Sequence, residues 1–237
     1  MDRYILDEIP FQPDIESLMK RVRIKGAGPF AEDFARLVGE GQKIARPKAL
    51  YRLAFIETRE GDTVTIDGVA FTSRVLRVNL EQAHRVFAYV ATCGREIQQW
   101  TLSQSDLLCR YWAEALEESA LGCAIQALNA HITTHHLPGP SSTMAPGRLG
   151  NWPLSEQRAL FALLGDTQAD IGVELMGSLL MVPTKSVSGM RFPTEQSFES
   201  CQLCPRETCP GRRAPYDGNL YARRYAGQER PVIGPNG

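Results

Sequence analysis

The sequence contains no long hydrophobic run. No window is apolar enough, over the length needed, to span a bilayer. The opening residues, MDRYILDEIPFQPDIE, carry too many acids for a secretion signal, so we expect a cytoplasmic protein with no membrane partner. A charge excess is also absent, because the formal net charge is -1. That balance gives no electrostatic argument for a nucleic-acid partner, and we expect none.

Internal repeats and low-complexity segments are absent as well. Of the 237 residues, 43% are hydrophobic and 22% are charged, which is typical of a globular protein with a sizeable core. Towards the end of the chain the apolar patterning weakens, and Pro, Gly and Arg become frequent. We therefore predict an α+β domain over residues 1–198 and a cysteine-containing tail over residues 199–237 that packs on it.

Hydrophobic periodicity predicts both helices and strands. The expected helices lie within 14–47, in two segments separated near Gly26-Ala27-Gly28, and at 79–84 after an N-cap at Asn79, at 105–132 and at 154–164. The expected strands lie at 51–58, 63–66, 69–71, 86–91, 171–173, 178–182 and 186–192. A tight hairpin turn is predicted at Asp67-Gly68.

The segment 105–132 is the clearest helix. Its apolar residues recur every four positions, at Leu108, Trp112, Leu116, Ala120, Ala124 and Leu128. Three acids are predicted to lie away from that row: Glu114, Glu117 and Glu118. We predict an α+β fold in which this helix is central and packs with the others on a twisted antiparallel sheet. The sheet is expected to carry the segments around 51–71, 86–92 and 171–192.

The loop that precedes Leu154 combines residues suited to ligand binding. Gly147 and Gly150 allow close approach of a ligand to the backbone. Arg148 can bind a carboxylate in forked fashion, and Trp152 can offer an aromatic face to a base or a sulfonium cation. Pro153 fixes the start of a helix whose free N–H groups favour anions. A structural loop is the alternative interpretation of the same residues.

Two motifs in one register resemble the activation domain of cobalamin-dependent methionine synthase. Asn151-Trp152-Pro153 stands where that family has Gly-Tyr-Pro at the start of a short helix. The segment from Met181 to Gly189, MVPTKSVSG, is similar to the Trp-Pro-x-x-Ser-Val-Ser-Gly segment that follows there. Small stand-alone members of the superfamily carry Gly-x-Trp-Pro-Leu and Pro-x-Lys-Ser-Val-Ser, as this chain does. The similarity covers roughly fifty residues.

The resemblance implies binding of S-adenosylmethionine, with a cobalamin supplied by a partner. The binding residues it implies are Gly147, Arg148, Gly150, Asn151, Trp152, Pro153, Lys185 and Ser186. Three features depart from the family, of which one is the absence of its aromatic pair after the Ser-Val-Ser-Gly segment. Its binding arginine lies five residues before the aromatic, where this chain has Gly147 and places Arg148 one residue later. Its N-terminal acid, which meets the ligand's amino group, has no clear counterpart here.

Three cysteines lie close together in the tail, at Cys201, Cys204 and Cys209. Their spacing lets thiolates chelate one centre, and two of them precede proline, as beside iron–sulfur clusters. A fourth ligand is expected to be Cys93, or the fourth position is open. An iron–sulfur cluster (4Fe-4S), zinc and a redox thiol set remain alternatives. His131, His135 and His136 we interpret as helix C-terminal cations rather than metal ligands.

Two functions follow from the resemblance. In the first, the chain reactivates a corrinoid methyltransferase in trans by reductive methylation, presenting S-adenosylmethionine and an electron to cob(II)alamin. The electron would come from the tail cluster or from an electron donor protein. In the second, the chain is a non-catalytic module that docks on a corrinoid protein and has a structural zinc in its tail. Whether the chain is an enzyme thus stays open at this point.

Overall fold

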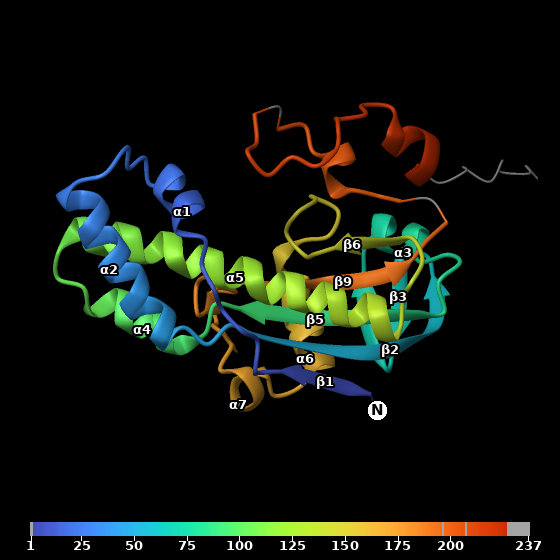
Figure 1. Cartoon of the computed structure of the whole chain (residues 1–237). Helices are drawn as coiled ribbons and strands as arrows, with labels where there is room; N and C mark the ends of the chain where they lie inside the picture. The colour runs from blue at the N-terminus through green and yellow to red at the C-terminus, as the bar shows by residue number, and fades with distance from the viewer. Residues whose placement is uncertain (1, 196, 207, 227–237) are drawn as a thin grey trace, which may run out of the picture.

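A twisted antiparallel sheet forms the centre of the molecule (Figure 1). The computed structural model describes residues 2–195, 197–206 and 208–226. Seven strands form the sheet: β1 (Arg3–Leu6), β2 (Lys48–Glu60), β3 (Thr63–Ile66), β4 (Val69–Thr72), β5 (Arg85–Thr92), β6 (Ser141–Met144) and β9 (Ser186–Pro193). Their order is β4-β3-β2-β5-β9-β6, and β1 pairs with the first part of β2. The α+β prediction is confirmed.

Helices cover both faces of the sheet. The long helix α5 (Leu107–His135) packs on one face, where Leu128 contacts the cluster that includes Phe87 and Tyr89. On the opposite face pack α3 (Arg74–Asn79), α6 (Gln157–Leu164) and the 3-10 turn η1 (Leu154–Glu156). Two short elements, α7 (Thr167–Ile171) and the β7 (Glu174–Leu175)–β8 (Met181–Val182) hairpin, lead from α6 to β9.

A helical lobe extends beyond the end of the sheet (Figure 1). It consists of α1 (Ile15–Arg21), α2 (Pro29–Ile44), α4 (Arg95–Ser103) and the first half of α5. Gly41 lets α2 approach α5 closely, because a side chain there would overlap Leu116 and Trp100. Among the described residues no helix is long and apolar enough to cross a bilayer.

The tail packs on the domain, close to edge strand β6. It contains the short turns η2 (Ser200–Leu203) and η3 (Tyr221–Tyr225). The Phe198 N–H donates to Ser142 Oγ at 2.7 Å, and the Tyr225 hydroxyl donates to Asn79 Oδ1 at 3.1 Å. Phe198 and Tyr225 are both buried in the core of the main domain. The last part of the predicted tail, residues 227–237, lies outside the described residues.

Two predicted elements are wrong in place. The helix expected after Asn79 instead ends there, because Ser73 caps it and accepts from the Leu76 N–H. Asn79 is buried, and its amide donates to Met144 Sδ and accepts from Tyr225. The strand expected at 171–173 is instead the end of α7 and its Gly172 cap. A short apolar run does not distinguish a strand from the end of a helix.

Candidate functional site

The loop between β6 and η1 is closed on itself by backbone hydrogen bonds. The Gly147 N–H donates to the Trp152 carbonyl at 2.8 Å, and the Trp152 N–H donates to the Leu149 carbonyl at 3.0 Å. Gly147 has φ +79°, which favours glycine. Pro153 is exposed and precedes η1. The sequence therefore folds this segment into a tight loop at the edge of the sheet.

Trp152 is directed into the protein rather than towards a ligand. Its side chain is completely buried in the core beneath the sheet, together with Leu160 and Met190. The prediction that its ring offers a face to a base or sulfonium cation does not hold in this structure, because core side chains cover the ring. Burial of the largest aromatic in the loop instead anchors the loop to the domain.

Arg148, by contrast, is exposed on the outer side of the loop. Its guanidinium has no hydrogen bond or ion pair among the described residues. Gly150 faces open space, and Asn151 Oδ1 is buried without a partner in the described structure. Arg148 is thus the predicted binding residue that is most available to a ligand.

Tyr89 lies next to this loop on the face of the sheet that α5 covers in part. It pairs with Gly189 across β5 and β9, and a Cβ at Gly189 would come within 2.8 Å of the Tyr89 hydroxyl. Burial raises the pKa of Tyr89, while the positive charges of Arg148, Arg213 and Arg191 oppose that rise. Three guanidinium groups, one of them from the tail, are therefore gathered near one phenol.

The other two arginines of this group are engaged. Arg213 pairs with Glu199 at 3.1 Å. Arg191 donates to Ser141 Oγ at 2.9 Å and to Thr133 Oγ1 at 2.9 Å. Sequence reasoning did not find Tyr89 or Arg213. The available sequence signal was Gly189 in the middle of β9, because a glycine there lets the Tyr89 side chain lie close over the strand.

Lys185 and Ser186 stand at the start of β9, at the other end of the site. The Ser186 hydroxyl is buried, donates to the Pro183 carbonyl at 2.7 Å and contacts Thr92 Oγ1 at 2.9 Å. It therefore fixes the strand rather than facing a ligand. Lys185 Nζ donates to Glu118 Oε1 at 2.8 Å. Arg21 of α1 also forms an ion pair with Glu118. Two ion pairs to Glu118 of α5 therefore link α5 to α1 and to the residue that precedes β9.

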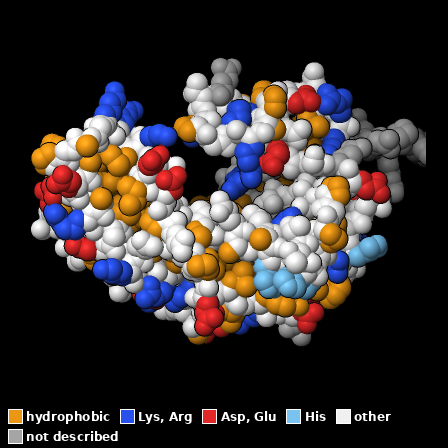
Figure 2. Space-filling view, viewed as in Figure 1, with side chains coloured by type: hydrophobic (Ala, Val, Ile, Leu, Met, Phe, Trp, Pro, Cys, Tyr) orange, Lys and Arg blue, Asp and Glu red, His pale blue; other side chains and the backbone are white. Residues whose placement is uncertain are grey.

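A deep notch separates the helical lobe from the tail above α5 (Figure 2). Basic and acidic side chains both border it, and the loop that carries Arg148 lies on its tail side (Figure 1). The loop therefore borders this space. We call this space the central notch.

The predicted four-cysteine site is not formed. Cys93 is buried in the helical lobe, where burial raises the pKa of its thiol to about 12. The tail thiols Cys201, Cys204 and Cys209 lie in the tail and are half-buried. Across the described parts of the chain, no group of three or more Cys, His, Asp or Glu side chains is arranged to hold a metal ion. Cys93 therefore fails as a fourth ligand, because the end of β5 lies beneath α4 and α5.

One arginine organises the tail loop that carries these thiols. Arg212 donates to the backbone carbonyls of Cys201 and Cys204 at 3.0 Å each, and to that of Arg206. The Arg213 N–H donates to Cys201 Sγ at 3.4 Å. Arg212 and the Arg213 backbone thus have a structural role in the tail loop.

The comparisons with known proteins bear on the fold. No protein-family model matches the sequence, and no curated protein matches it. Among solved structures, the chain is similar to the MetH reactivation domain bound to AdoHcy. The TM-score is 0.56 at 16% sequence identity, over 84% of this chain and 81% of that chain. The chain therefore has the fold of that reactivation domain.

Proposed function

We propose that this protein reactivates a corrinoid-dependent methyltransferase in trans and holds S-adenosylmethionine in the central notch. The fold shared with a reactivation domain that binds AdoHcy is the observation that carries the proposal. Arg148 on the loop beside the notch supports it, because its exposed guanidinium has no hydrogen bond or ion pair among the described residues and a carboxylate such as that of the methionine group is its natural partner.

The chemistry asks little of the protein in acid or base groups. The partner's corrinoid is the substrate: cob(II)alamin takes up one electron and then a methyl group, and S-adenosylmethionine leaves as S-adenosylhomocysteine. The electron comes from a separate one-electron donor protein. The chain's contribution is to hold the sulfonium group in line with the corrinoid and exclude water, which is catalysis by positioning.

Substitution of Arg148 tests the proposed methyl-donor site. We expect Arg148→Ala to weaken S-adenosylhomocysteine binding in calorimetry by tenfold or more, because one charge-assisted contact contributes roughly 1.5–3 kcal/mol. The same substitution should also slow the recovery of activity of an inactivated corrinoid methyltransferase in an assay in which a chemical reductant supplies the electron. Arg158→Ala, a change at another exposed arginine, is the matched control. Equal affinity of the Arg148 and Arg158 variants would count against the site.

A non-catalytic docking module is the second candidate, and the burial of Trp152 favours it, because the expected aromatic contact with the ligand is missing. This protein would bind a corrinoid protein without binding S-adenosylhomocysteine. Calorimetry with millimolar S-adenosylhomocysteine separates the two candidates. If no heat of binding is observed but gel filtration shows a complex with a corrinoid protein, the chain is the docking module.

We also propose that the three tail cysteines, without Cys93, hold a soft metal centre, either an iron–sulfur cluster or zinc. Their spacing and the ordering of their loop by Arg212 support this. Metal and acid-labile sulfide analysis of anaerobically purified protein tests it, with a Cys201→Ser/Cys204→Ser variant as control. Iron with sulfide identifies a cluster and zinc alone a structural site. Equal, trace metal in both proteins would exclude a centre.

A further inference from the structure

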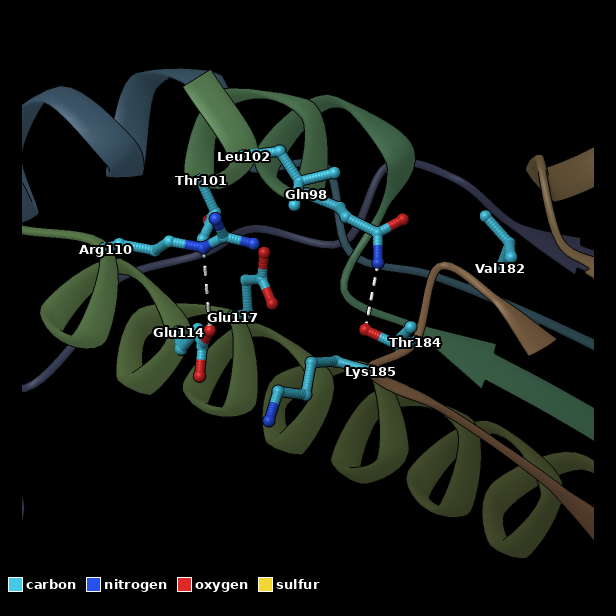
Figure 3. Close-up of a pocket in the computed structure, with 9 residues that line it drawn as sticks. All are labelled: Gln98, Thr101, Leu102, Arg110, Glu114, Glu117, Val182, Thr184 and Lys185. Carbon is cyan, nitrogen blue, oxygen red and sulfur yellow. Dashed lines mark hydrogen bonds and ion pairs between the residues drawn. The ribbon is translucent and has the colours of Figure 1, made fainter. Parts of the chain in front are cut away.

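A pocket of about 400 Å³ opens between α4, α5 and the segment that precedes β9 (Figure 3). A cavity of this size accommodates a small ligand. Its lining residues are Gln98, Thr101, Leu102, Arg110, Glu114, Glu117, Val182, Thr184 and Lys185. Only Lys185 belongs to the residues implied by the sequence motifs, so the rest of the pocket is unassigned.

Glu117 is the most unusual group in the pocket. The sequence pattern places it on the outer side of α5, yet only 3% of the residue is exposed. Glu117 Oε1 has no partner that meets hydrogen-bond geometry among the described residues. Burial raises the pKa of Glu117, and the buried Thr101 hydroxyl, which lies beside this carboxyl, opposes part of that rise. A buried, unsatisfied carboxylate is destabilising, and a ligand with N–H donors would satisfy it.

The cationic groups of the pocket differ in how firmly they are held. Lys185 Nζ is turned away in Figure 3 and donates to Glu118, outside the pocket. Arg110 has one ion-pair partner, Glu114, with Nε and Oε1 4.0 Å apart. A guanidinium held so loosely can take up a carboxylate in forked geometry.

The remaining wall limits the shape of the ligand. Gln98 Nε2 donates to Thr184 Oγ1 at 2.9 Å and joins α4 to the segment before β9 (Figure 3). Leu102 and Val182 add aliphatic surface. Within the pocket Arg110 and Glu117 supply opposite charges, since the Lys185 ammonium is turned towards Glu118. Separated opposite charges beside an aliphatic wall match a zwitterion that carries an apolar side chain.

We propose that this pocket binds an α-amino acid group, with its ammonium on Glu117 and Thr101, its carboxylate on Arg110 and its side chain against Leu102 and Val182. The group can belong to a free apolar amino acid such as methionine or to the methionine half of S-adenosylmethionine. The pocket is argued from its own residues, so the proposal does not depend on methyl transfer.

Calorimetry on the full chain tests the proposal with L-methionine as probe. We expect Glu117→Gln and Arg110→Met each to weaken binding at least tenfold. N-acetylmethionine, which lacks the ammonium, and methioninol, which lacks the carboxylate, should bind equally poorly to the wild type. Glu81→Gln is the control, because Glu81 lies just after α3 and outside the pocket. A thermal melt of each variant confirms that it is folded.

A second titration with S-adenosylhomocysteine identifies the source of the amino acid group. If Glu117→Gln weakens both ligands, the pocket holds the methionine half of the methyl donor, and Arg110 rather than Arg148 binds its carboxylate. If only L-methionine is affected, the pocket is a separate amino-acid site, and Arg148 serves the methyl donor alone. Both results support the pocket. Absence of L-methionine and S-adenosylhomocysteine binding at millimolar concentration, or equal binding by wild type and Glu117→Gln, overturns it.

Discussion

At the scale of single residues, Tyr51 shows how the end of α5 is fixed to the sheet. Its hydroxyl lies 2.8 Å from His131 Nδ1 and 3.0 Å from His136 Nε2, and Tyr4 of β1 stacks on its ring. The hydroxyl can donate to one histidine and accept from the other, so the arrangement needs at least one neutral imidazole. The histidines predicted to act as C-terminal cations are therefore structural hydrogen-bonding groups as well.

This cluster predicts a loss of stability on acidification. Burial lowers the pKa of His131 and of His136, with a further contribution from His135. The unfolded chain therefore binds more protons than the folded one below about pH 6.5. The free energy of unfolding should hold above that pH and fall as the pH decreases below it. Urea denaturation at pH 7.5 and 5.5 measures the difference.

Substitutions that preserve hydrogen bonding identify the source of that loss. Asn at 131 places an amide near the position of Nδ1, and Gln at 136 places one near the position of Nε2. The double variant His131→Asn/His136→Gln should therefore show a flatter profile between pH 7.5 and 5.5. His84→Asn, at an exposed position away from the cluster, should retain the wild-type profile. A double variant with the wild-type acid loss would assign the effect to other groups.

At the scale of elements, the long periodic segments could be predicted and the short ones could not. α5 and β5 lie within a few residues of their expected limits. Each has a long hydrophobic pattern, so an uncertainty of a few residues at its ends does not change the element. The hairpin at Asp67-Gly68 could also be predicted, because the preference of these two residues for a tight turn is local. The limits of α3 and α7 are set by single capping residues: Ser73 accepts from the Leu76 N–H, and the Gly172 N–H donates to carbonyls of its own helix. In such short helices a cap shifted by a few residues moves the whole element.

The side of α5 on which Glu117 lies illustrates the same limit. A four-residue repeat advances 40° per step around an α-helix, which has 3.6 residues per turn. The buried stripe therefore drifts along a helix of 29 residues, and Ala113, Glu117 and Ala120 share one buried face. The sequence signal for the pocket was Glu117, an acid inside the apolar stripe. A strict four-residue repeat wrongly assigns it to the exposed side of the helix.

For the candidate site, the sequence motifs indicate the loop at 147–153 and the start of β9, but not which side chains are exposed there. The loop at 147–153 borders the central notch, and Lys185 before β9 lines the pocket between α4 and α5. The roles within them differ, because Trp152 and Ser186 are buried, whereas Arg148 is exposed. Burial depends on how the loop closes, and the closing bonds join backbone groups that carry no residue preference.

At the scale of the whole molecule, the tail is part of the folded body and forms one wall of the central notch. Tyr225 is the main attachment, since 1% of the residue is exposed and Arg74 Nε donates to its carbonyl at 3.0 Å. The boundary predicted at residue 198 therefore marks a change in amino-acid composition, while the packing of the hydrophobic core continues across it. A single hydrophobic core includes residues from both sides of it.

That shared core predicts cooperative unfolding. Tyr225→Ala should lower the free energy of unfolding by about 3 kcal/mol, the usual cost of removing a large aromatic from a core. Tyr216→Ala, at a tail tyrosine that is 51% exposed, should cost little. Urea denaturation followed by tryptophan fluorescence measures both, since the tail contains no tryptophan. Labelling of the tail thiols in low urea should become faster in Tyr225→Ala and not in Tyr216→Ala. If Tyr225→Ala speeds labelling without moving the fluorescence transition, the tail is a separate unit, and the notch can open without unfolding the domain.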